Sequence, residues 1–207
     1  MLAYVFWHWP ARDVRTDEYE QLQRAFHAAL AQARPDAFQR SIVFRIDGVA
    51  PWLGGSPAYA DWYLVEGSAA LDPLNVAAVS GVCEQPHAQL AHAMAAGAGS
   101  LFGLRGSDPK IDTAGYATCL TKPRSMPYET FYAAAASLPD SQSSSLWRRQ
   151  MVLGPTPEFI LLTPTRLTIP ETLQPLPLEL TPIGQAHYRN RSNPNRRGCR
   201  RGLSGPS

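Results

Sequence analysis

The sequence predicts an α+β protein in which the element order β-α-β-β-α-β occurs once in full and once in part. Apolar residues alternate along several short segments, as in strands, and recur at helical spacing in the segments between them. The chain of 207 residues is 44% hydrophobic and 17% charged, which is ordinary for a globular protein with a sizeable core. After residue 170 prolines accumulate, so we expect the ordered body to end there.

The first strand covers residues 2–8, which are rich in aromatic and β-branched side chains. Both of its faces are apolar, which predicts a strand that is covered on both sides, and Pro10 ends it. A helix follows, because Asp17 and Glu18 suit a first turn and apolar residues then recur at helical spacing. Pro35 disfavours helical conformation in the residue before it, so the helix ends there.

Two further strands cover residues 41–49 and 59–65, and the turn-rich segment PWLGGSP joins them in an open hairpin. Two short helices, at residues 74–80 and from 86 to about 96, come before a fourth strand at residues 101–105. The small residues GAG are expected to end the second of these helices. This part of the chain therefore has the element order of a ferredoxin-like unit.

We place the first ferredoxin-like unit at residues 1–106, a linker at 107–114 and a partial second unit at 115–170. The second unit shows strand, helix and hairpin patterns but no clear second helix or last strand. Residues 167–169 are the candidate for a brief replacement strand. Residues 171–207, Pro-rich and then basic, are predicted to form a disordered tail.

Charge and cysteine content exclude several classes of protein. Six arginines and no acid follow Thr181, which leaves 13 basic against 17 acidic residues and a net charge of −4 in residues 1–181. An acidic body makes nucleic-acid binding an unfavoured function. Three widely spaced cysteines suggest neither a disulfide framework nor a zinc site, which fits a cytoplasmic protein. The apolar N-terminal run is too short for a membrane span or a signal core, so we expect no membrane association.

The element order and the aromatic first strand resemble the dimeric α/β-barrel superfamily, which includes EthD-like proteins and antibiotic-biosynthesis monooxygenases. The segments YVFWHWP, DGVAPWLGG and DWYLVEG…LDPLNVAAVSG are also similar to a family of bacterial proteins of this fold. The resemblance implies two ferredoxin-like sheets packed face to face, within one chain or between two. It also implies a pocket between a concave sheet face and its helices. The superfamily's chemistries include cofactor-free oxygenation, haem binding, muconolactone-type isomerisation and ligand binding, so the activity stays open.

Three polar residues are the candidate catalytic groups. His8 ends the first strand, and a histidine can act as a general base near neutral pH. Asp61 and Tyr63 lie on one face of the third strand, opposite Trp62, so a carboxylate and a phenol can act together on a substrate. The structural alternative is that His8 bonds nearby backbone and that Asp61 accepts backbone N–H groups of the PWLGGSP loop.

Five aromatic residues are the candidate ligand-binding groups: Trp7, Trp9, Trp52, Tyr59 and Trp62. They suit an apolar cavity for a small apolar or aromatic compound, although core packing or a subunit interface uses the same residue types. We therefore expect a cofactor-independent oxygenase or isomerase, with His8 or Asp61 as base and Tyr63 as hydrogen-bond donor. The alternative is a non-catalytic structural or ligand-binding homodimer.

No motif predicts a metal or a cofactor. His87 and His92 lie about 140° apart around a helix and are poor joint ligands, although either one alone is a candidate haem ligand. Cys83 and Cys119 are predicted to be small buried apolar residues. The short GxG that starts at Gly97 follows a helix instead of opening one, so it does not fit a phosphate-binding loop.

Overall fold

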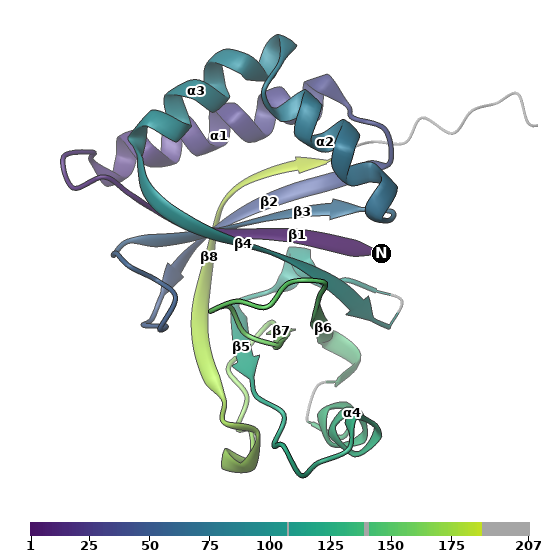
Figure 1. Ribbon diagram of the computed structural model, residues 1–207. Coiled ribbons are helices and arrows are strands. Elements are labelled where there is room, and N and C mark those ends of the chain that lie inside the picture. Colours follow the sequence, from purple (N-terminus) through teal and green to yellow (C-terminus); the bar gives the residue numbers. More distant parts are fainter. Residues whose placement is uncertain (107, 139–140, 188–207) are drawn as a thin grey trace, which may run out of the picture.

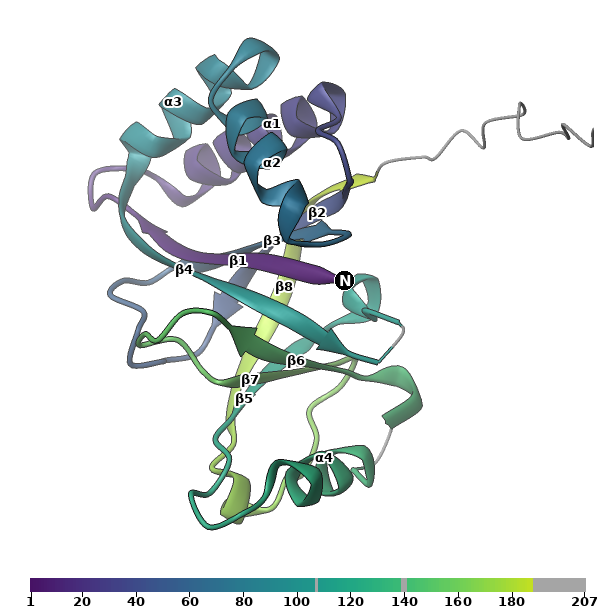
Figure 2. The same cartoon turned by 45° about the vertical axis from the view of Figure 1, so that its right-hand side comes forward.

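The computed structural model describes residues 1–106, 108–138 and 141–187. Eight antiparallel strands form a closed barrel in the order β1-β3-β2-β8-β5-β7-β6-β4. Three helices cover one side of the barrel and a fourth lies at the opposite side (Figures 1 and 2). The protein is therefore of the mixed α+β class that the sequence predicts.

The elements follow one another in a regular order along the chain. The strands are β1 (Leu2–Pro10), β2 (Phe38–Asp47), β3 (Ala58–Val65), β4 (Met94–Arg105), β5 (Tyr116–Leu120), β6 (Ser145–Gln150), β7 (Phe159–Thr163) and β8 (Leu176–His187). The helices are α1 (Thr16–Ala33), α2 (Leu71–Ala78), α3 (Glu84–Ala93) and α4 (Tyr128–Ala136). Within the described part of the chain, no helix combines the length and the apolar character that a membrane crossing requires.

The barrel consists of two halves with the same internal strand order. The first half has the order β4-β1-β3-β2 and lies under α1, α2 and α3, and the second half has the order β8-β5-β7-β6 and lies beside α4 (Figure 2). Because the barrel closes within the described residues, it has no open strand edge.

The interior of the barrel is a packed aromatic and aliphatic core. Trp62 meets Trp147 edge to face with ring centroids 5.4 Å apart, and Trp7 meets Phe102 in the same way at 5.7 Å. All four side chains are almost fully buried. The alternation along β1 sends Trp7 inward and His8 outward under the helices, which confirms that both faces of the first strand are covered.

The prediction that a helix continues to residue 96 is wrong, because β4 begins at Met94 and includes the GAG segment. This stretch pairs with β1, with Gly97 opposite His8 and Gly99 opposite Phe6. A Cβ atom on Gly97 would lie 2.5 Å from the Phe6 ring. The small residues therefore allow aromatic side chains of β1 to lie flat across β4, and they do not end a helix.

The prediction of a disordered tail from residue 171, and of an incomplete second unit, is wrong for residues 176–187. These residues form β8, which pairs with β2 and β5 and closes the barrel. Leu176, Leu178 and Leu180 alternate toward the interior, and Pro182 lies where the register with β2 shifts, a place that tolerates proline. Residues 167–169 form no strand. The rest of the predicted tail, residues 188–207, lies outside the described residues.

We predict that Gly97→Ala lowers the free energy of unfolding by about 1–3 kcal/mol, because the new methyl group would collide with Phe6 and with the backbone oxygen of Trp7. Urea denaturation measures the change. Gly67→Ala is the matched control, since nothing lies within 4 Å of an added Cβ at that extended residue. Equal losses in the two variants would contradict the proposed close approach.

We also predict that Leu178→Ala destabilises the protein by about 2–5 kcal/mol, because it empties part of the barrel core. The neighbouring Glu179 is exposed, so Glu179→Ala should change stability by less than about 0.5 kcal/mol. If both substitutions are equally mild in thermal or urea unfolding, β8 does not close the barrel.

Candidate functional site

A buried polar cluster lies on the outer face of the first half of the barrel, under α1. In the antiparallel pair of β1 and β3, Phe6 lies opposite Asp61 and His8 lies opposite Tyr59. His8 and Asp61 are therefore diagonal neighbours on one face, and His8 Nε2 is 3.0 Å from Asp61 Oδ1. Two candidate catalytic residues that are 53 positions apart in sequence are thus in direct contact.

Helix α1 adds three polar side chains at four-residue spacing, which places them on one helix face: Tyr19, Gln23 and His27. The Tyr19 hydroxyl oxygen is 2.6 Å from His8 Nδ1, and Gln23 Nε2 is 3.2 Å from His8 Nε2. His27 Nδ1 is 2.7 Å from Ser41 Oγ on β2. The sequence analysis missed Gln23 and His27, although their spacing on the apolar face of the helix is a signal that could have found them.

The hydrogen bonds fix how the protons of the cluster are arranged. A carboxylate only accepts, so His8 Nε2–H donates to Asp61 Oδ1 and the hydroxyl of Tyr63 donates to Oδ2 at 2.8 Å. The other ring nitrogen of His8, Nδ1, faces the Tyr19 hydroxyl. His27 Nε2 lies 3.5 Å from Asp61 Oδ2 and makes no hydrogen bond to any described residue. Donors from two strands, together with the nearby imidazole of His27 on α1, therefore surround a single carboxylate.

Opposing effects set the ionisation of Asp61. Burial disfavours its charged form, but attraction to His8 and His27 outweighs burial and holds the pKa of this carboxyl below its ordinary value. Burial, and then the negative charge of Asp61, raise the pKa of Tyr63 well above its ordinary value. At neutral pH the site therefore holds an ionised carboxylate beside a neutral phenol.

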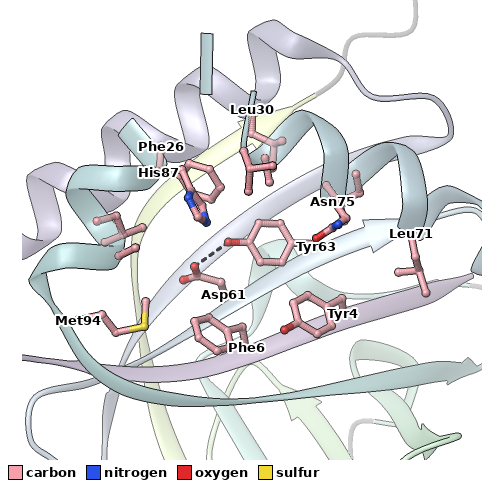
Figure 3. A pocket seen from close by; sticks show the side chains of 15 residues that line it. Tyr4, Phe6, Phe26, Leu30, Asp61, Tyr63, Leu71, Asn75, His87 and Met94 are labelled. Carbon is pink, nitrogen blue, oxygen red and sulfur yellow. Dashed lines mark hydrogen bonds between the residues drawn. The ribbon is translucent and has the colours of Figure 1, made fainter. Parts of the chain in front are cut away.

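A cavity of about 490 Å³ opens beside Asp61 and Tyr63, between the sheet and the three helices (Figure 3). Most of its lining is apolar, including Phe6, Phe26, Leu30, Leu74, Leu90 and Met94. His87 and Asn75 face Tyr63 from the helices across the cavity (Figure 3). An apolar cavity with a few convergent polar groups is the usual form of a small-molecule site.

The third strand divides into the two faces that the sequence predicts. Asp61 and Tyr63 lie on the outer face and line the cavity, whereas Trp62 lies in the barrel interior. His8 does not line the cavity; it lies behind Asp61 and contacts the cavity only through that carboxylate. From this position His8 can orient the carboxylate, but it does not touch a ligand in the cavity.

The prediction that five aromatic residues line a ligand cavity is not matched by their positions. Trp7, Trp52 and Trp62 pack in or against the barrel interior, because closure of the sheet turns its inner face into a core. Trp9 lies directly over Gly54 and Gly55 in the loop between β2 and β3. None of these tryptophans lines the cavity beside Asp61.

Tyr59, the fifth of these aromatic residues, supports His8 instead of lining the cavity. Its ring stacks on the His8 imidazole with centroids 5.7 Å apart and an interplanar angle of 9°. Its hydroxyl lies 3.4 Å from Glu20 Oε1. Burial, together with the charge of Glu20, raises the pKa of Tyr59 to about 12, so its phenol stays neutral.

The remaining candidate groups lie apart from the cluster or play no part in it. His87 lines the cavity and packs edge to face on Phe26, whereas His92 is exposed on α3. Cys83 and Cys119 are buried, as predicted, and burial raises the pKa of both thiols. Among the described residues no group of three or more His, Cys, Asp or Glu side chains is placed to hold a metal ion.

We predict that the stability of the wild type falls as the pH decreases below about 5 and that Asp61→Asn loses this part of the dependence. The reason is that the unfolded chain takes up a proton at Asp61 near pH 3.8, while the folded carboxyl has a lower pKa. Urea unfolding at a series of pH values measures it, with Asp47→Asn, at the exposed end of β2, as control.

A second variant keeps this test usable if Asp61→Asn does not fold. Tyr63→Phe removes one donor to Asp61, which should raise the carboxyl pKa and flatten the same acid limb in part. An acid limb that is identical in wild type, Tyr63→Phe and Asp61→Asn would show that folding does not lower the pKa of Asp61.

Comparison with known proteins shows a shared fold. No protein-family model and no curated protein matches the sequence. Among solved structures, a "putative monooxygenase" from Lactobacillus acidophilus matches with a TM-score of 0.53 and 7% identity, over 90% of this chain and 96% of that chain. An anthrone oxidase-like protein matches with a TM-score of 0.45 and 9% identity, over 80% of this chain and 73% of that chain.

A "putative chlorite dismutase" also matches, with a TM-score of 0.49 and 12% identity over 89% of this chain and 97% of that chain. The match to the monooxygenase structure shows that the fold extends over most of both chains. At such low identity the similarity establishes the fold alone, so the chemistry must be argued from the site.

Proposed function

We propose that this protein binds a small apolar or aromatic compound in the cavity beside Asp61 and exchanges a proton with it. The observation that carries the proposal is an ionised carboxylate, buried at the wall of a mainly apolar cavity and held by His8 and Tyr63. Burying such a charge is costly, and a carboxyl perturbed by burial and specific partners in a cleft is typical of a functional site.

Asp61 has the capacity to accept a proton from a bound ligand. A carboxylate offers about four acceptor positions, and the hydrogen bonds from His8 and Tyr63 occupy two of them. Its lowered pKa makes Asp61 a weak base, so the substrate must itself be fairly acidic, as are phenols, enols and 1,3-dicarbonyl compounds. Transfer moves the negative charge from Asp61 to the ligand, where His8 and His27 still stabilise it.

Tyr63 is the proposed hydrogen-bond donor to the oxygen that becomes negative. Its raised pKa keeps the phenol protonated, and its hydroxyl lies at the cavity wall next to Asp61. When Asp61 accepts the ligand proton, the Tyr63 hydroxyl is free to turn from the carboxylate to the new oxyanion.

The second half of the barrel supports a functional role for the cluster. We propose that the halves are tandem ferredoxin-like units, at residues 1–106 and 115–187, joined by residues 107–114. The outer face of the second unit, under α4, has a cluster of buried leucine and phenylalanine side chains where the first unit has its polar cluster: Leu120, Phe131, Phe159, Leu161 and Leu173. Since apolar packing serves that face equally well, folding alone does not explain the buried charge of the first.

The reaction class follows from the fate of the deprotonated ligand. Return of the proton to another carbon gives an isomerisation, whereas an electron-rich carbanion can react with dioxygen as oxidant without a cofactor. The similarity to a monooxygenase structure motivates the oxygenase version. We propose that the protein belongs to the EthD-like branch of the superfamily. Proton abstraction is the first step of both versions, so it is the step to test.

A second candidate function is non-catalytic ligand binding. The almost complete burial of Asp61, with two acceptor positions already used, favours this version, because such a network also fixes the shape of the cavity wall. In that case the protein binds the same class of compound and leaves it unchanged.

The test has two stages, binding and proton exchange. A thermal-shift screen of phenols and cyclic 1,3-diketones identifies a ligand. The ligand is then incubated with protein in D₂O, and NMR follows deuterium incorporation at its acidic carbon. We expect wild type and the Asp47→Asn control to accelerate exchange by at least about 100-fold, the usual scale of general-base catalysis, and Asp61→Asn to abolish it.

Binding without exchange in the wild type would establish the non-catalytic version. Exchange that persists in folded Asp61→Asn would remove Asp61 as the base. A screen in which no compound raises the melting temperature would count against both versions.

A further inference from the structure

A second cavity, of about 430 Å³, lies in the other half of the barrel between α4 and the strands β4, β6 and β7. Its walls include the apolar side chains of Leu104, Leu146 and Leu161, together with Arg105 and Tyr132. It is separate from the cavity beside Asp61, with which it shares no lining residue. The function proposed above makes no use of it.

Two guanidinium groups converge on the phenol of Tyr132 at this cavity. The Arg105 Cζ atom lies over the Tyr132 ring, 4.5 Å from its centroid. Arg148 approaches the other end of the side chain, with Nη1 donating to the Tyr132 hydroxyl oxygen at 3.4 Å. Arg148 also lies over the ring of Tyr128, one helical turn away, at 4.3 Å. Positive charges and aromatic rings therefore alternate along the face of α4 that borders the cavity.

The positive charges at this place have no carboxylate partner among the described residues. The arginine and lysine ion pairs of the described residues lie elsewhere, and none within 4.0 Å includes Arg105 or Arg148. The nearby acid Glu158 accepts the hydroxyl of Tyr128 instead. This arrangement is unusual in a body whose residues 1–181 carry a net charge of −4. Among the described residues, the guanidinium groups of Arg105 and Arg148 therefore have no carboxylate to offset their mutual repulsion near Tyr132. A bound anion would relieve that repulsion.

Tyr132 has a donor to offer such an anion. Its hydroxyl oxygen accepts from Arg148, which polarises the group and leaves the hydroxyl proton available for donation. Among the described residues, no side chain or backbone oxygen accepts that proton. A guanidinium and a polarised hydroxyl are the donors that carboxylate and phosphate groups prefer.

We propose that this cavity binds a small organic anion. Arg105 and the Tyr132 hydroxyl hold its carboxylate or phosphate group, Arg148 supplies long-range attraction, and Leu104, Leu146 and Leu161 contact its apolar body. The apolar wall distinguishes this ligand from a bare inorganic ion, which would leave those side chains uncovered. The site is independent of the Asp61 cavity and of the reaction proposed there.

Isothermal titration of the full chain with three probes tests the proposal. Benzoate carries the charge and the apolar body, benzamide has nearly the same shape without the charge, and inorganic phosphate has the charge without the body. We expect benzoate to bind most tightly, phosphate more weakly, and benzamide at least about 10-fold more weakly than benzoate, as the loss of a charge-assisted bidentate contact implies.

Substitutions locate the site. Arg105→Gln should weaken benzoate binding by about 10-fold or more, and Tyr132→Phe by about 3-fold to 10-fold. Arg166→Gln removes the same charge from an exposed position after β7 and should leave binding unchanged. Arg105 is exposed at the end of β4, so its replacement is expected to leave the fold intact.

Equal binding of benzoate and benzamide would overturn the proposal, because charge would then play no role. Equal weakening by Arg105→Gln and Arg166→Gln would overturn it as well, since the effect would reflect net charge alone. No binding of benzoate at millimolar concentration would have the same meaning.

Discussion

The buried charge of Asp61 is the constraint on which the first half of the barrel depends. An ionised carboxylate in an apolar layer needs polar partners, and here two hydrogen-bond donors and a second imidazole surround it. His8 comes from β1, Tyr63 from β3 itself and His27 from α1. These contacts determine which face of α1 turns toward the sheet, and they place α1 so that the cavity opens beside the carboxylate and not over it.

Closure of the barrel separates the two faces of its strands into different tasks. The inner faces of both halves form one core around Trp62 and Trp147, which leaves no room there for a ligand. The outer face of the first half carries the buried carboxylate, whereas the outer face of the second half packs a cluster of leucine and phenylalanine side chains beneath α4. The cavity beside Asp61 and the cavity beside Tyr132 both lie between sheet and helices.

The sequence predicted most elements of both halves, and it missed the start of β4 and the whole of β8. Period-two alternation located β1, β2 and β3, and it placed Asp61 and Tyr63 on the face opposite Trp62. Two predictions made from local composition were wrong: the GAG segment suggested a helix end, and the prolines around β8 suggested disorder. In both places long-range pairing overrides local preference, with β1 for the glycines and with β2 and β5 for β8. The prediction that the aromatic residues line a ligand cavity failed for a related reason. Trp7 packs in a core only because the barrel closes, and closure depends on long-range strand pairing.

Proton transfer from a ligand to Asp61 requires that Asp61 is ionised inside the folded protein while its neighbour Tyr63 stays neutral. A ¹³C NMR titration of the aspartate carboxyl groups, with Asp61→Asn used to assign the Asp61 signal, measures this directly. We predict that the Asp61 carboxyl shows no titration between pH 8 and about 4 and that its midpoint lies below the ordinary value of 3.8. A midpoint near neutral pH would mean that the cluster holds a protonated acid, and it would contradict Asp61 as the resident base of the cavity.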